Sequence, residues 1–165
     1  MLHSNRELFE QTVLRTADAT GIAASIIEKD YYVTEFLRKL TSYQPDIVFK
    51  GGTSLSKCYK LIQRFSEDID LNVEDRPSEG QRKALKRNIV AVIDDLDLSL
   101  SNAEEIRSRR DYNRYIINYP ALRGAAYLKQ QLIVETVVSM RAFPNHPMDA
   151  SSLIYDFLKD TGRDD

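Results

Sequence analysis

The chain has 165 residues, which is long enough for one hydrophobic core, and we expect a single domain over residues 1–165. With 23 basic and 25 acidic residues the net charge is −2, so no global positive field attracts nucleic acid, and an RNA partner would need a local basic patch. One cysteine and two histidines exclude a disulfide framework and leave too little material for a zinc cluster or a Ser-His-Asp triad. The sequence shows neither a signal-peptide pattern nor an apolar run that spans a bilayer, which predicts a cytoplasmic protein without membrane contact.

Two amphipathic helices are predicted before the first strand. Residues 4–18 form the first, and Gly21 separates it from a second over residues 23–40. The second helix carries three consecutive charged residues at 28–30. Their plain interpretation is an exposed helix surface.

A glycine turn follows the first predicted strand. Residues 46–50 are a short β-branched run that ends at Gly51-Gly52, where the backbone can adopt angles closed to other residues. Thr53 or Ser54 can then cap a helix. In this helix the apolar side chains recur every three or four residues and should face a sheet, whereas the polar ones should point outward. The apolar set is Leu55, Cys58, Tyr59, Leu61 and Ile62, and the outward set is Lys57, Lys60 and Gln63.

An acidic strand is predicted next, over residues 66–74. Its period of two places Asp68 and Asp70 on one face and Ile69 and Leu71 on the other. Two carboxylates about 7 Å apart along a strand repel each other, and a divalent cation between them relieves that repulsion. The glycine turn supplies bare backbone N–H groups that bind phosphate. Phosphate and metal together indicate phosphoryl or nucleotidyl transfer.

Two other interpretations of this stretch remain open. Gly-Gly can be only a turn and the acids only a solvated strand edge. Alternatively, acidic and amide residues match positions 1, 3, 5, 7 and 12 of a calcium-binding loop, although Val73 stands where that loop needs glycine. These residues are Asp68, Asp70, Asn72, Glu74 and Glu79. A P-loop is excluded, because no Gly-Lys-Ser/Thr follows a glycine-rich run.

The second half is predicted to contain a helix over residues 79–96, a brief extended piece at 98–100, strands at 112–119 and 130–139, and a last helix at 151–159. The first of these helices begins with four basic residues that either bind RNA phosphates or form solvated surface. They are Arg82, Lys83, Lys86 and Arg87.

Glu135 is the one acid in the apolar run of the last strand. Burying a lone carboxylate costs several kcal/mol unless it is paired or liganded. Glu135 is therefore either a third metal ligand that arrives from a neighbouring strand or the partner of a base such as Arg141.

The runs FKGGTSL and RFSEDIDL within residues 49–71 resemble the nucleotidyltransferase superfamily, whose signature is a glycine pair, a spacer and Asp-x-Asp. The residues of these two runs resemble the AbiEii/AbiGii toxin branch more closely, and the MenT toxins are related to this branch. The spacer between Gly52 and Asp68 is 15 residues, longer than usual for the superfamily but similar to this branch. Residues 28–32 resemble the branch's opening helix, so the resemblance covers about residues 23–142. The branch usually continues into a helical C-terminal part that carries a catalytic motif. Lys159-Asp160 resembles the beginning of that motif.

This resemblance implies an α/β or α+β domain, in which a small mixed sheet is flanked by helices in the polymerase beta-like nucleotidyltransferase fold. It implies transfer of a nucleotide from an NTP to RNA, for example a tRNA, by a toxin with a cognate antitoxin. Mg²⁺ or Mn²⁺ would be held by Asp68, Asp70 and Glu135. The NTP would be bound by Gly51, Gly52, Thr53, Ser54, Lys57, Arg64 and Ser66. The alternatives are a truncated, non-catalytic member that binds a nucleotide or a partner, and a transferase acting on a protein or a small molecule.

Overall fold

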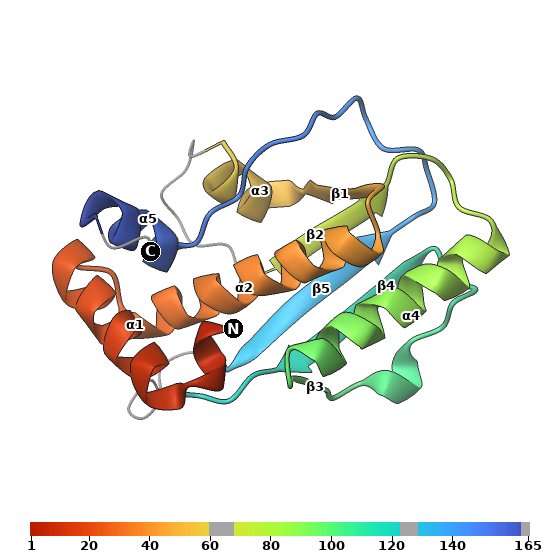
Figure 1. The fold of residues 1–165 in the computed structure, drawn as a ribbon. Helices are drawn as coiled ribbons and strands as arrows, with labels where there is room; N and C mark the ends of the chain where they lie inside the picture. The colour runs from red at the N-terminus through yellow and green to blue at the C-terminus, as the bar shows by residue number, and fades with distance from the viewer. Residues whose placement is uncertain (60–67, 123–128, 163–165) are drawn as a thin grey trace.

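The fold is built on a five-stranded mixed sheet (Figure 1). The computed structural model describes residues 1–59, 68–122 and 129–162. The strand order is β1-β2-β5-β4-β3, in which β2 and β5 run parallel and the other neighbouring pairs run antiparallel. The strands are β1 (Ile47–Lys50), β2 (Asp68–Val73), β3 (Ser99–Leu100), β4 (Tyr112–Asn118) and β5 (Gln131–Val137). The predicted α/β class and mixed sheet are confirmed, and the brief extended piece is the edge strand β3.

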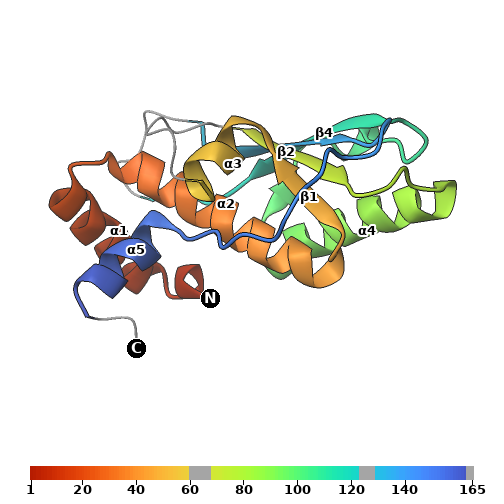
Figure 2. The same cartoon turned by 90° about the horizontal axis from the view of Figure 1, so that it is seen from above.

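Helices cover one face of this sheet. In both views α2 and α4 lie along the same side, while α1 and α5 pack at the end of α2 away from α4 (Figures 1 and 2). The helices are α1 (Arg6–Thr20), α2 (Ala24–Tyr43), α3 (Gly51–Lys57), α4 (Glu79–Asp95) and α5 (Leu153–Asp160), with the 3-10 turns η1 (Leu2–Ser4) and η2 (Ala103–Glu105). Among the helices of the described ranges, none has both the length and the hydropathy that crossing a bilayer requires.

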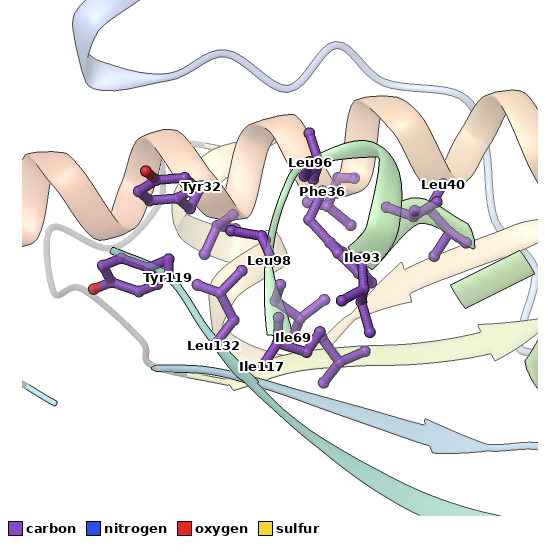
Figure 3. Packing of buried hydrophobic residues seen from close by; sticks show 14 of the residues in the cluster. Tyr32, Phe36, Leu40, Ile69, Ile93, Leu96, Leu98, Ile117, Tyr119 and Leu132 are labelled. Carbon is purple, nitrogen blue, oxygen red and sulfur yellow. The ribbon is translucent and has the colours of Figure 1, made fainter. Parts of the chain in front are cut away.

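The core lies between the sheet and the helices α2 and α4. Phe36 of α2 and Ile93 of α4 meet strand residues such as Ile69, Ile117 and Leu132 (Figure 3). Each such side chain, once fully buried, contributes about 1.5–3 kcal/mol of hydrophobic free energy. Because strand residues alternate between faces, the neighbours of these core residues lie on the face that α2 and α4 leave uncovered.

The charged residues of α2 are buried, so their interpretation as exposed surface was wrong. Glu28, Lys29 and Asp30 are all at most 5% exposed, because α1, α5 and the sheet surround this part of α2. Glu28 accepts a hydrogen bond from the backbone N–H of Leu122 at 2.9 Å. Buried polar groups of this kind persist only with such partners.

The orientation of α3 is also the reverse of the prediction. The helix begins at Gly51 and ends at Lys57, so neither Thr53 nor Ser54 is its N-cap. Leu55 is 41% exposed, whereas Lys57 is 5% exposed. The short helix turns its polar edge inward because that edge finds hydrogen-bonding partners there. Of the remaining stripe, Cys58 is half-buried and Tyr59 is 43% exposed, and both follow the end of α3; Leu61 and Ile62 lie outside the described residues.

Candidate active site

Four charged residues form a row across the uncovered face of the sheet. The strand register pairs Lys50 of β1 with Asp70 of β2, Asp70 with Glu135 of β5, and Glu135 with Arg114 of β4. Residues that are directly opposite on neighbouring strands share a face, with their Cβ atoms about 4.5–5.5 Å apart. Two carboxylates thus lie side by side with one cation beyond each of them.

The carboxylates of this row are crowded. Burial raises the pKa of Asp70, Glu135 raises it further, Lys50 lowers it, and Asp68 contributes a smaller increase. Asp68 lies two residues before Asp70 and therefore on the same face. The carboxylates on this face carry more negative charge than Lys50 neutralises. An added cation would reduce the repulsion between them.

The glycine turn lies directly against the acidic strand. Gly51 has φ +73°, and a Cβ atom built on it would overlap Oδ2 of Asp70. The Thr53 hydroxyl donates a hydrogen bond to the backbone oxygen of Asp68. Gly51 must be glycine for two reasons, since its φ is left-handed and its neighbour leaves no room for a side chain. Gly52 follows inside the first turn of α3.

Glu135 lies beside Asp70 but is held by β4. Its Oε1 atom accepts a hydrogen bond from the Tyr112 hydroxyl at 2.9 Å and lies 3.6 Å from Nε of Arg114. Its side chain is 26% exposed, so the prediction of a buried carboxylate was wrong; strand alternation places it on the uncovered face. The alternative prediction, that Glu135 pairs with a basic residue, is confirmed, but the partner is Arg114 and not Arg141, which pairs with Asp75 at 3.1 Å.

The donor set suits a hard divalent cation, and one oxygen of Glu135 is already engaged by β4. Asp68 and Asp70 present carboxylate oxygens on one face, and these are the ligands that Mg²⁺ prefers. Within the described ranges, no three His, Cys, Asp or Glu side chains stand together in an arrangement that holds a metal ion. The two aspartates therefore fit such an ion by their chemistry, and Glu135 could join them through Oε2 while Oε1 stays bonded to Tyr112.

A family model for the Nucleotidyl transferase AbiEii toxin, Type IV TA system, matches residues 35–162. The chain belongs to this family. The match begins within α2 and extends through α5, so it contains the glycine turn, the acidic strand and Glu135. It therefore runs past residue 142, where the resemblance drawn from the sequence motifs ended.

A solved structure supports the same fold. The chain resembles MenT4, a nucleotidyltransferase toxin from Mycobacterium tuberculosis H37Rv, with a TM-score of 0.53 and 20% sequence identity. The similarity covers 90% of this chain and 50% of MenT4, so the chain spans about half the length of that protein. A comparison with curated protein sequences gave no match.

In this AbiEii family member, three predicted nucleotide-binding side chains support the turn from within. Thr53 bonds to the acidic strand, and the Ser54 hydroxyl donates to the backbone oxygen of Gly51 at 2.8 Å. The Lys57 ammonium pairs with Oδ1 of Asp30 at 2.5 Å, which directs its charge toward α2. Two further predicted residues, Arg64 and Ser66, lie outside the described residues.

The sequence-based prediction did not include Lys50, Tyr112 or Arg114. Lys50 directly precedes the glycine turn, and Tyr112 and Arg114 alternate along a predicted strand, so their common face was readable from the period of two. Their position beside the carboxylates depends on which residue pairs with which across strands. That register became visible only in the structure.

Proposed function

We propose that this AbiEii family member transfers a nucleotide from an NTP to an RNA acceptor, such as a tRNA, as the toxin of a toxin–antitoxin pair. The observation that carries the proposal is the contact between the glycine turn and the acidic strand, where Gly51 leaves room for Asp70 and no side chain. A phosphate-binding turn and a metal-binding strand must meet in this way if one NTP is to contact both. The cognate antitoxin is the protein partner that we infer from the family.

In the proposed reaction an acceptor hydroxyl oxygen attacks the α-phosphorus of the NTP, and the bond from that phosphorus to pyrophosphate breaks. The backbone of Gly51 and Gly52 approaches the triphosphate, while Thr53 fixes the strand that carries Asp68. Asp68 and Asp70, with Glu135, would hold Mg²⁺ or Mn²⁺. When bound, such an ion polarises the acceptor hydroxyl and offsets negative charge on the triphosphate.

The cations at the two ends of the charged row contribute to the same chemistry. Lys50 and Arg114 flank Asp70 and Glu135 on the uncovered face. Pyrophosphate leaves with more negative charge than the bound NTP carried on those oxygens, and fixed cations next to the site stabilise such developing charge. Both residues would orient phosphate groups through their positive charge.

The decisive experiment incubates the protein with each labelled NTP, Mg²⁺ and total cellular RNA, and resolves the products on a gel. Label should appear in RNA for the wild type, and Asp70→Asn should lose it almost completely while it remains folded. Asp75→Asn is the matched control. Asp75 is an exposed acid that lies just beyond the end of the same strand, and its carboxylate pairs with Arg141. An Asp70→Asn protein that retains most of its transfer would disprove the catalytic assignment.

The other functions have distinct outcomes in this assay. Label in protein or in a small molecule would indicate a different acceptor class. Binding of NTP without transfer would indicate a non-catalytic member that binds a nucleotide or a partner.

A further inference from the structure

A strongly basic cleft lies between α4 and the segment that leads into β4. Its volume is about 540 Å³, and its charged lining is Lys83, Lys86, Arg107, Arg109 and Arg110. Among the described residues, none of those that line it is acidic. We call this surface the basic cleft. Because the whole chain has a net charge of −2, this is a local concentration of positive charge and not a general property of the surface.

The backbone of the cleft is fixed in place from three sides. Arg82 of α4 forms an ion pair with Asp111 at 2.5 Å. The Asn113 side chain accepts from the backbone N–H of Arg107 at 2.9 Å and donates to its backbone oxygen at 3.0 Å. Lys86 donates to the backbone oxygen of Ile106 at 3.2 Å. A ligand that binds here therefore meets a preformed surface and orders little backbone.

The arginines of the cleft form no close ion pairs with the described residues, although the positive charge of Arg109 is among the causes that lower the pKa of Glu79, after the hydrogen bond and charge of Lys83. Within the described part of the chain, Arg107, Arg109 and Arg110 form no ion pair with a carboxylate, whereas Arg38 pairs with Glu35 at 2.7 Å. All three are exposed. Like charges held this close repel one another, so the favoured ligand carries several negative charges at regular spacing.

The segment that lines the cleft continues into β4, which carries two residues that contact Glu135. Arg110 precedes Tyr112 by two residues and Arg114 by four, and Tyr112 and Arg114 both contact Glu135. Because β4 begins at Tyr112, the strand rise of about 3.3 Å per residue sets an upper limit of about 13 Å on the distance from Arg110 to Arg114. The cleft lies on the α4 side of the sheet and the carboxylates lie on its uncovered face, so a chain-like polyanion reaches them by passing from the cleft around the beginning of β4.

We propose that the basic cleft binds the phosphodiester backbone of the RNA acceptor and guides it to the carboxylates, an inference that rests on the proposed function. Arginine side chains bind phosphate oxygens through charge-assisted, bidentate hydrogen bonds. A protein partner fits less well, because protein interfaces have an apolar centre and the apolar residue of this cleft, Ile106, is itself only 1% exposed.

The test compares two double variants that remove the same charge. Arg109→Ala/Arg110→Ala removes two cleft arginines whose side chains make no hydrogen bond or ion pair with the described residues, and Arg15→Ala/Arg38→Ala removes two from the distant helices α1 and α2. Binding of fluorescently labelled bulk tRNA is measured by anisotropy over a range of salt concentrations. The cleft variant should bind tRNA at least tenfold more weakly. Its plot of log association constant against log salt should also be shallower by about 1.4, or about 0.7 for each phosphate that is no longer neutralised. The control should bind within about twofold of the wild type.

Equal tRNA affinity in the cleft variant and the wild type would overturn the inference. The inference would also be overturned if poly-L-glutamate of matched charge displaced the labelled tRNA as effectively as unlabelled tRNA does. The cleft would then accept any acidic polymer. Affinity for magnesium-bound NTP is measured in parallel and should be unchanged in the cleft variant. If the wild type shows arginine-dependent tRNA binding but transfers no nucleotide, the proposed function fails and the cleft remains an RNA-binding surface.

Discussion

The ion pair between Lys57 and Asp30 should be the most consequential polar contact for the stability of the site. It joins α3 to α2, and the Lys57 ammonium also donates to the backbone oxygen of Ser151 at 3.2 Å. The second oxygen of Asp30 accepts from the backbone N–H of Leu153 at 2.7 Å. One buried pair therefore connects the helix that follows the glycine turn with α2 and with the start of α5.

Replacing Lys57 with methionine keeps most of the side-chain volume and removes the charge. The Asp30 carboxylate then stays buried without its cation, which typically costs about 3–5 kcal/mol. That loss is a large part of a total stability of about 5–15 kcal/mol. The double variant Asp30→Asn/Lys57→Met should recover much of it, because no unpaired charge remains while the asparagine oxygen still accepts from Leu153.

Urea unfolding followed by circular dichroism measures both effects. Lys83→Met is the matched control, because Lys83 is an exposed lysine paired with Glu79 on α4, and its unfolding midpoint should hardly change. A loss below about 1 kcal/mol for Lys57→Met would refute this reasoning. So would a double variant that is as unstable as the sum of the two single variants, since the two residues would then not be coupled.

Three further predictions concern the turn, the buried acid of α2 and the metal. Gly51→Ala should be clearly less stable than Gly21→Ala in thermal melts, because both glycines have φ +73° but only at Gly51 does the new Cβ collide with Asp70; equal losses would mean that Asp70 moves away freely. Burial raises the pKa of Glu28 to about 7, so the native state keeps a proton that the unfolded chain releases near pH 4.5, and this stabilising effect is lost as the pH rises through 7. Glu28→Gln should therefore remove a decline in urea stability between pH 5.5 and 8 that the wild type shows, and an identical decline in both proteins would contradict the assignment. At ten times its dissociation constant, Mg²⁺ should stabilise the wild type by about 1.4 kcal/mol, a rise in Tm of about 3–6 °C; Asp70→Asn should abolish this rise and Glu135→Gln should reduce it, whereas a full rise in Glu135→Gln would exclude that carboxylate as a ligand.

The strands and the acidic face were predictable because a period of two is a local property of the sequence. Asp68, Asp70, Ile69 and Leu71 sort themselves onto two faces without knowledge of any other strand. The contact between the glycine turn and Asp70 is not local, because it depends on the antiparallel pairing of β1 with β2 across the intervening α3.

The burial of α2 and the inward lysine of α3 were not predictable in this way. Charged residues usually lie at the surface, and the sequence around Asp30 contains no sign that Lys57 will arrive from another helix. The same holds for Glu135, whose partner Arg114 belongs to the adjacent strand while the expected alternative, Arg141, lies closer in sequence. In each case the missing information was a tertiary pairing between residues that are distant in the chain.

The hydrophobic core nevertheless constrains the register that builds the site. Ile69 of β2 is paired with Val134 of β5, both are fully buried, and the next pair along the same two strands is Asp70 with Glu135. A slip of β5 by one residue would turn Val134 to the uncovered face and bring Glu135 into the core, at a cost of several kcal/mol for the unpaired charge. The apolar residues that hold the sheet to α2 and α4 therefore also keep the two carboxylates side by side. Substitutions that loosen this core should disturb the charged row even though they lie on the opposite face of the sheet.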